Sequence, residues 1–115
     1  MKNQTGDKAR LQHILLAISE IEKYVQDYSI SSFLSDFKTH FATIKQLEII
    51  GEASNHLSAE TIRDFNEIDW RGIRSFRNIL IHECFNVRLE DVWETIFADL
   101  PPLKVTVEKM LLKFP

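Results

Sequence analysis

An arginine, an asparagine and a histidine lie close together near the predicted end of one helix, at Arg77, Asn78 and His82. Arginine presents a planar set of N–H donors that suits a phosphate group. Neutral histidine takes or gives a proton near neutral pH. Residues 79–81, between the two, are all apolar, and no other stretch combines these groups. Residues 70–93 are therefore the candidate site.

The spacing of these residues constrains how they work together. On a regular helix, five residues of separation place Arg77 and His82 about 140° apart around the axis. Two arrangements would still bring them together. The helix unwinds at His82, or a twofold dimer brings Arg77 of one chain near His82 of the other.

A purely structural role also accounts for these residues. His82 would interact with the negative end of its helix. Spacing alone favours this interpretation, because short motifs match by chance. Arg77 would then form an ion pair with one of four carboxylates: Glu48, Glu52, Glu83 or Asp91.

Length and composition predict one domain over residues 1–115. The net charge of −3 argues against broad, sequence-blind binding to nucleic acid, although it leaves room for a local basic cleft. The single cysteine, Cys84, cannot form an internal disulfide, which favours a reducing compartment. No signal peptide and no apolar run long enough to span a membrane is present, so we expect a cytoplasmic protein.

Apolar residues at steps of three and four predict an all-α protein, an up-and-down antiparallel bundle of four to five helices. Residues 29–35 are expected to be a break, and Pro101-Pro102 to end the fourth long helix. The expected helices are one capped by Asp7 with a stripe from Leu11 to Tyr28, one capped by Asp36 and running to about Leu57, a short one at 59–65, one at 70–82 capped by Asp69, one at 88–100 and one at 103–114.

The second long helix carries a glycine and a narrow polar line. Gly51 lies mid-helix, where glycine costs about 1 kcal/mol relative to alanine, so we expect another helix to approach closely there. Lys45, Glu48 and Glu52 lie on the polar line. It is either a solvated edge or the place where Glu48 or Glu52 holds the guanidinium of Arg77.

Competing chemical motifs are absent from the sequence. There is no glycine-rich phosphate loop, no Cys-x-x-Cys pair, no zinc-helix spacing of histidines and no Gly-x-Ser-x-Gly elbow. His13, His40 and His56 are scattered and are interpreted as surface or partly buried residues. The sequence thus predicts no metal site and no cofactor.

Four blocks of sequence, in order, resemble the HepT-like branch of the HEPN domains. Residues 77–82 are similar to the Arg-polar-x-x-x-His motif of HEPN domains. The other blocks are Leu-Glu-Ile-Ile-Gly-Glu-Ala at residues 47–53, Asp-Trp-Arg-Gly-Ile at 69–73, and Leu-Glu-Asp-Val-Trp at 89–93 with Asp-Leu-Pro at 99–101. The resemblance covers about residues 7–112.

The resemblance implies a compact helical bundle that forms a homodimer, with two Arg-His motifs meeting in a cleft at the interface. It also implies a metal-independent endoribonuclease, the toxin of a type VII toxin–antitoxin system with a minimal nucleotidyltransferase as antitoxin. His82 would then be the general acid or base at a ribose 2′-hydroxyl or 5′-oxygen. Arg77 would stabilise charge on the phosphate, and Asn78 would orient His82 or the phosphate. The products would be a 2′,3′-cyclic phosphate and a 5′-hydroxyl.

Two positions depart from the family pattern. Cys84 stands where relatives often carry a tyrosine that the antitoxin adenylylates, and a thiol is a poor substitute for that phenol. Lys45 stands where many relatives have arginine, so it keeps the charge without the bidentate fork; it would bind RNA phosphate more weakly or contact only Glu48 or Glu52.

Three hypotheses follow from the sequence. The first is the dimeric ribonuclease toxin that cleaves an RNA substrate. The second is a non-catalytic binding module that docks a nucleotidyltransferase or a nucleotide, which Cys84 slightly favours. The third is an inert structural dimer in which Arg77 is tied into ion pairs.

Overall fold

The computed structural model describes residues 6–83 and 86–114, and this part of the chain is helical with no strand. Five of its helices have ten or more residues and two have six. The all-α prediction is therefore confirmed. In chain order the helices are α1 (Asp7–Tyr24), α2 (Ile30–Ser35), α3 (Phe37–Asn55), α4 (Ala59–Asp64), α5 (Trp70–His82), α6 (Leu89–Ala98) and α7 (Leu100–Leu111).

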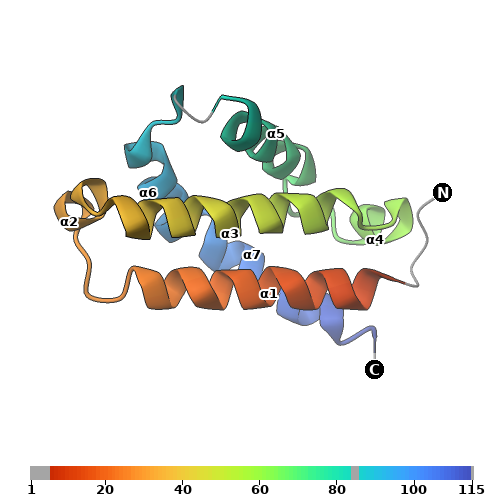
Figure 1. Ribbon diagram of the computed structural model, residues 1–115. Helices are drawn as coiled ribbons and strands as arrows, with labels where there is room; N and C mark the ends of the chain where they lie inside the picture. Colours follow the sequence, from red (N-terminus) through yellow and green to blue (C-terminus); the bar gives the residue numbers. More distant parts are fainter. Residues whose placement is uncertain (1–5, 84–85, 115) are drawn as a thin grey trace.

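The two longest helices, α1 and α3, run antiparallel side by side (Figure 1). Helix α5 packs on α3, while α7 packs against α1 and α6 on another side of the pair. One apolar core joins these helices. Its fully buried large side chains include Leu11, Ile14, Ile18, Ile21, Phe33, Leu57, Leu80, Val92, Val107 and Met110. No helix in the described residues is both long and apolar enough to cross a bilayer.

Side-chain caps begin three of these helices, and the sequence predicts two of them, Asp36 and Asp69. Asp36 accepts a hydrogen bond from the Thr39 backbone N–H at 3.0 Å and begins α3. Ser58 begins α4 and Asp69 begins α5 in the same manner, each bonding the N–H three residues on. A hydrogen bond from the Tyr28 hydroxyl, followed by bonds from Thr39, lowers the pKa of Asp36 to about 2.

Asp7 is not a cap, contrary to the prediction. It is the first residue of α1, after Gly6, and its side chain is fully buried. Its carboxylate accepts hydrogen bonds from the Ser58 backbone N–H at 3.0 Å, the Ser58 hydroxyl at 2.7 Å and the Thr61 hydroxyl at 2.6 Å. These bonds tie the start of α1 to the start of α4.

Several predicted boundaries are also wrong. The stripe from Leu11 to Tyr28 is not all helix, since α1 ends at Tyr24, and the expected break at residues 29–35 contains α2. Pro101-Pro102 open α7 instead of ending α6, which stops at Ala98. Proline fits there because N–H groups in the first turn have no intrahelical partner.

Helices α3 and α5 approach each other closely at Gly51, as its mid-helix position predicts. A Cβ atom at Gly51 would lie 2.3 Å from the Cβ of Arg77 and 2.6 Å from its Cγ. The missing side chain is therefore what makes room for the arginine stem. Because Arg77 is itself a candidate site residue, this helix crossing positions the site.

We expect Gly51→Ala to destabilise the protein. Alanine favours a helix over glycine by about 1 kcal/mol, but the added methyl overlaps the Arg77 stem. Overpacking of this kind costs about 1–3 kcal/mol, and the Arg77 backbone, 3.5 Å away, limits relaxation.

Urea unfolding of Gly51→Ala beside Ser75→Ala, a substitution on the exposed face of α5, measures this effect. The Ser75 variant should unfold at a urea concentration close to that of the parent protein. Equal or greater stability of Gly51→Ala would contradict the close contact.

Candidate active site

Helix α5 presents the motif residues and is fixed at its start. The Asp69 carboxylate accepts the Gly72 backbone N–H at 2.9 Å, and the buried Trp70 donates its indole N–H to the Phe65 carbonyl at 2.9 Å. Buried Leu80 anchors the other half of the helix to the core. The helix spans Trp70–His82, as predicted, so Arg77, Asn78 and His82 share one rigid element.

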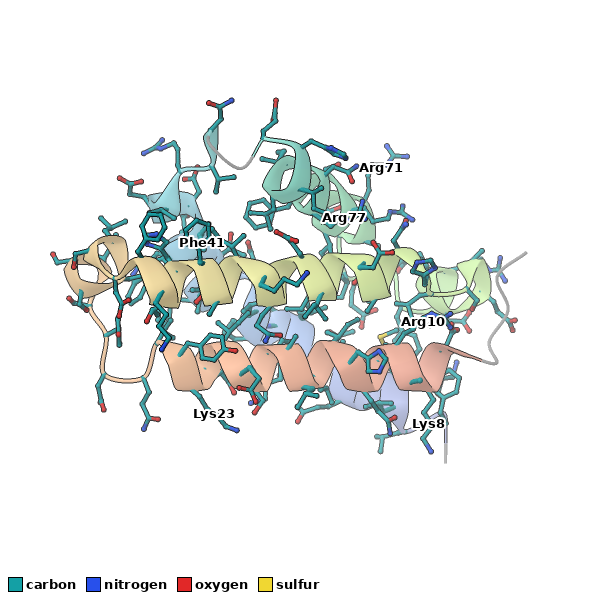
Figure 2. The ribbon with its side chains drawn as sticks, viewed as in Figure 1. Lys8, Arg10, Lys23, Phe41, Arg71 and Arg77 are labelled. Atoms are coloured by element: carbon teal, nitrogen blue, oxygen red, sulfur yellow. The ribbon has the colours of Figure 1, made fainter. Side chains whose placement is uncertain are left out.

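The guanidinium of Arg77 is held by two acceptors. Its Nη2 donates to Glu52 Oε2 at 2.5 Å, and its Nη1 donates to Asn78 Oδ1 at 2.9 Å. Figure 2 shows Arg77 between α5 and α3. The predicted pairing of Arg77 with Glu48 or Glu52 is thus confirmed for Glu52. Glu48 forms no ion pair with any described residue.

Arg77 keeps unused donors in this arrangement. Its Nε is buried and has no hydrogen-bond partner among the described residues. The guanidinium has five N–H donors in all, so Glu52 and Asn78 leave most of them open. The side chain is 25% exposed, which leaves the guanidinium accessible to an anion from solvent.

Glu52 carries a negative charge that steadies Arg77. The pKa of its carboxyl is lowered, chiefly by a hydrogen bond from the His56 ring at 2.8 Å and then by the charge of Arg77, while desolvation opposes both. The sequence interpretation missed His56 as a partner of this site. The four-residue spacing of Glu52 and His56 on one helix was the available signal.

Asn78 plays a part that the sequence did not indicate. Its carboxamide oxygen binds the adjacent arginine rather than His82 in this structure. With Glu52, it fixes the plane of the guanidinium from two sides. Asn78 itself is exposed, so its amide nitrogen stays accessible to a ligand.

His82 lies apart from the group formed by Arg77, Glu52 and Asn78. It is the last residue of α5, is exposed, and makes no hydrogen bond with another described residue. Of the two arrangements that would bring Arg77 and His82 together, unwinding at His82 is not observed, because α5 stays helical through that residue. Regular helical geometry therefore keeps Arg77 and His82 about 140° apart around the axis.

The remaining predicted site residues are not seen in contact with Arg77 or its partners in the described part of the chain. Lys45 is exposed on α3 and forms no ion pair with Glu48 or Glu52, so that interpretation of Lys45 is wrong. Cys84 lies outside the described residues. No group of His, Cys, Asp and Glu side chains within residues 6–83 and 86–114 is arranged to hold a metal ion.

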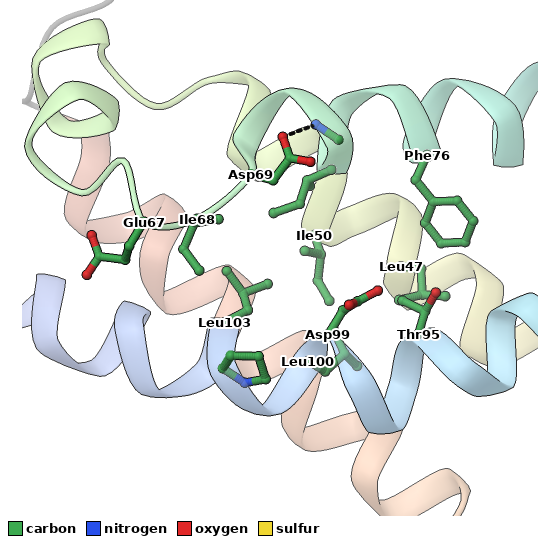
Figure 3. Close-up of a pocket in the computed structure, with 13 residues that line it drawn as sticks. Leu47, Ile50, Glu67, Ile68, Asp69, Phe76, Thr95, Asp99, Leu100 and Leu103 are labelled. Atoms are coloured by element: carbon green, nitrogen blue, oxygen red, sulfur yellow. Dashed lines mark hydrogen bonds between the residues drawn. The ribbon is translucent and has the colours of Figure 1, made fainter.

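A cleft of about 440 Å³ lies on the other flank of α5 (Figure 3). Its charged lining residues are Glu67, Asp69 and Asp99, and its floor is mostly apolar. None of the three motif residues lines it. Carboxylates without a basic residue disfavour phosphate, so this cleft does not fit the chemistry of the motif.

Comparison with known sequences identifies the family of this chain. The model of the family described as "Ribonuclease HepT-like" matches residues 14–110. The chain belongs to the HepT-like ribonuclease family. That result confirms the resemblance stated from the four sequence blocks.

Individual relatives agree with this assignment. A Thermococcus cleftensis protein named "Probable ribonuclease HepT" is 41% identical over 103 residues, which is 90% of this chain and 94% of the relative. A Caldanaerobacter subterraneus protein named "Putative RNase TTE0752" is 35% identical over 90% of this chain and 92% of its own length. A Methanocaldococcus jannaschii protein named "Gamma-glutamylcyclotransferase and putative RNase MJ0434" is 36% identical, over 90% of this chain and 47% of its own. No solved structure matches the chain.

The lowered pKa of Glu52 gives a pH-dependent prediction. A lowered carboxyl pKa stabilises the fold above the ordinary carboxyl pKa, and that stabilisation is lost as pH falls through the lowered value. Since the pair is half-exposed, we expect Glu52→Gln to cost less than ~1 kcal/mol at neutral pH and nothing in strong acid.

Urea titrations across acidic pH, with Glu48→Gln as the matched control, measure this difference. Glu48 is on the same helix face but has no ion-pair partner among the described residues. If the loss in free energy of unfolding caused by Glu52→Gln grew as pH fell, the assigned role of Glu52 would be contradicted.

Proposed function

We propose that this protein is the ribonuclease toxin of a type VII toxin–antitoxin pair and cleaves RNA without a metal ion. Membership of the HepT-like ribonuclease family is the observation that carries the proposal. The geometry adds a guanidinium held ready for an anion and an exposed imidazole on the same helix. Both groups suit a phosphodiester rather than a neutral substrate.

The chemical steps follow from these two groups. A neutral His82 takes the proton of a ribose 2′-hydroxyl as its oxygen attacks the adjacent phosphorus. Charge that builds on the phosphoryl oxygens is stabilised by Arg77. The bond from phosphorus to the 5′-oxygen breaks, and the leaving oxygen receives the proton that His82 has accepted. A 2′,3′-cyclic phosphate and a 5′-hydroxyl result.

The reaction needs the imidazole and the guanidinium at the same phosphate. A single chain supplies one His82, placed well away from its own Arg77 around the α5 axis. A twofold dimer would supply two histidines and two arginines. We infer that the active species is a homodimer whose two motifs face one groove.

An exposed apolar surface supports this dimer. Phe37 and Phe41 are 68% and 52% exposed, and their rings contact each other at a centroid distance of 4.4 Å. Helical periodicity places Phe41 on the same stripe of α3 as Glu52, the partner of Arg77. In Figure 2, Phe41 and Arg77 lie along the same edge of α3. A second copy that covered these rings would therefore meet the same side of α3 as the guanidinium.

The antitoxin of this pair would be a minimal nucleotidyltransferase. Position 84 offers a thiol in place of the usual phenol, so adenylylation there lacks its ordinary acceptor. Neutralisation would instead depend on a tight complex or another acceptor. The alternative function, a binding module that docks the nucleotidyltransferase without cleaving RNA, predicts that complex and no nuclease activity.

The catalytic role of His82 is tested with purified protein and RNAs of varied sequence. We expect cleavage to survive EDTA and to leave cyclic phosphate ends, detected by mass spectrometry. His82→Ala should slow cleavage by about 10²–10⁴-fold, the usual contribution of a general acid or base. His56→Ala, which alters a histidine at the Glu52 side of the site, should retain much more activity. RNAs left intact by the unaltered dimer would sink the nuclease proposal and favour the binding module.

The composite site is tested by mixing two inactive variants, Arg77→Gln and His82→Ala. Arg77→Gln keeps the Cβ and Cγ atoms that pack against Gly51, so folding should be preserved. If one site needs Arg77 and His82 from different copies, a mixed dimer contains one intact pair, and random exchange should restore about a quarter of full activity. Sedimentation measures the dimer, and RNA cleavage measures the recovery. A mixture as inactive as its components, despite proven exchange, would refute the shared site.

A further inference from the structure

Helix α5 has an unusual charge for this protein. The chain as a whole has a net charge of −3, yet α5 contains Arg71, Arg74 and Arg77 and no acidic residue in its 13 positions. Only Arg77 is neutralised, by Glu52. Positive charge is therefore concentrated on the one helix that carries the Arg-His motif.

Arg71 and Arg74 have no partner within the described residues. Neither forms a hydrogen bond or an ion pair there. The acidic residue four positions before Arg71, Glu67, pairs instead with Lys109 at 3.7 Å. Asp69 is engaged as the cap of the helix. An arginine stripe without counter-charges is suited to an anion supplied by another molecule.

The two arginines share a face with the catalytic histidine. At about 100° per residue, Arg71, Arg74, Asn78 and His82 fall within roughly 80° of one another around the axis. Arg71 and Arg74 lie about 16 Å and 12 Å along the helix from His82 at 1.5 Å per residue. Figure 2 shows the Arg71 side chain extending away from the bundle.

The opposite flank of α5 faces acidic residues instead of carrying basic ones. There Gly72, Ile73 and Phe76 line the cleft whose charged residues are all acidic. A polyanion would be repelled from that flank and drawn to the arginine face. The two flanks thus define one path for a charged chain along the helix, and this path ends at His82.

We propose that Arg71 and Arg74 bind backbone phosphates of single-stranded RNA lying along α5, several nucleotides from the bond that is cut. This inference depends on the proposed ribonuclease function and names the residues that position its substrate. At 12–16 Å from the histidine, the arginines are too far to act on the reacting phosphate. They are positioning residues, which change binding of long substrates and not the chemical step.

Binding is measured with a single-stranded RNA oligonucleotide and the His82→Ala variant, so that the RNA stays intact. Arg71→Gln and Arg74→Gln are added singly and together. Each released phosphate contact should reduce the slope of log K against log salt by about 0.7, so the double variant should lose ~1.4. Arg63→Gln, an exposed arginine on α4 without an ion-pair partner among the described residues, is the matched control and should leave the slope unchanged.

Cleavage kinetics give a second, independent readout. In protein with His82 intact, the Arg71→Gln, Arg74→Gln double variant should raise KM for a long RNA several-fold and leave kcat close to that of the parent. Circular dichroism and urea unfolding verify that the variants fold. If KM and the slope of log K against log salt were both unchanged in an active enzyme, phosphate binding by Arg71 and Arg74 would be refuted. The nuclease proposal would be unaffected.

Two other outcomes separate the possibilities. If the unaltered protein cuts no RNA, the proposed function fails, whereas the oligonucleotide binding measured with His82→Ala still tests the arginines. If the double variant binds RNA normally but loses its complex with a nucleotidyltransferase, the arginine face belongs to a protein partner and the inference is wrong.

Discussion

The contact between the Arg77 stem and Gly51 fixes the geometry of the candidate site. Because Gly51 has no side chain, α5 comes close enough to α3 for the arginine Cβ and Cγ to occupy that space. The next residue along α3, Glu52, then meets the guanidinium at 2.5 Å. Gly51 and Glu52 therefore act together: Gly51 leaves space for the arginine stem, and Glu52 orients its guanidinium.

The ion pair of Arg77 and Glu52 affects how a phosphate would bind. A phosphate at Arg77 must share the guanidinium with Glu52, whose lowered pKa keeps it ionised near neutral pH. The half-exposed ion pair is worth at most about 1 kcal/mol, because water screens it. A charge-assisted, bidentate contact with phosphate is stronger than that. Glu52 thus orients Arg77 in the free protein without blocking an anion, so the ion pair alone does not establish a purely structural role.

The site could be predicted from sequence where its signals were local. The bounds of α5 and its Asp69 cap followed from spacing and capping chemistry. The close approach at Gly51 followed from the cost of glycine inside a helix. Each of these signals was readable within a few residues of the feature it predicted.

Non-local structure was not predictable in this way. Asp7 resembles a cap by its position, but its role is set by Ser58 and Thr61, more than fifty residues later. Adjacent prolines disfavour a helix interior but suit its first turn, so Pro101-Pro102 fitted either the end of α6 or the start of α7. Only packing of α7 on α1 and α6 decided between them.

The same distinction applies to Arg77 and His82, the proposed catalytic pair. A continuous helix through His82 fixes the angular separation from Arg77, and no local adjustment of one chain removes it. The arginine is anchored at a helix crossing and the histidine at an exposed helix end, so bringing them to one phosphate requires a second surface. The aromatic rings exposed on the Arg77 side of α3 are an energetic reason for such a surface to form, since covering them removes apolar area from water. Dimerisation and catalysis would then depend on the same face of the molecule.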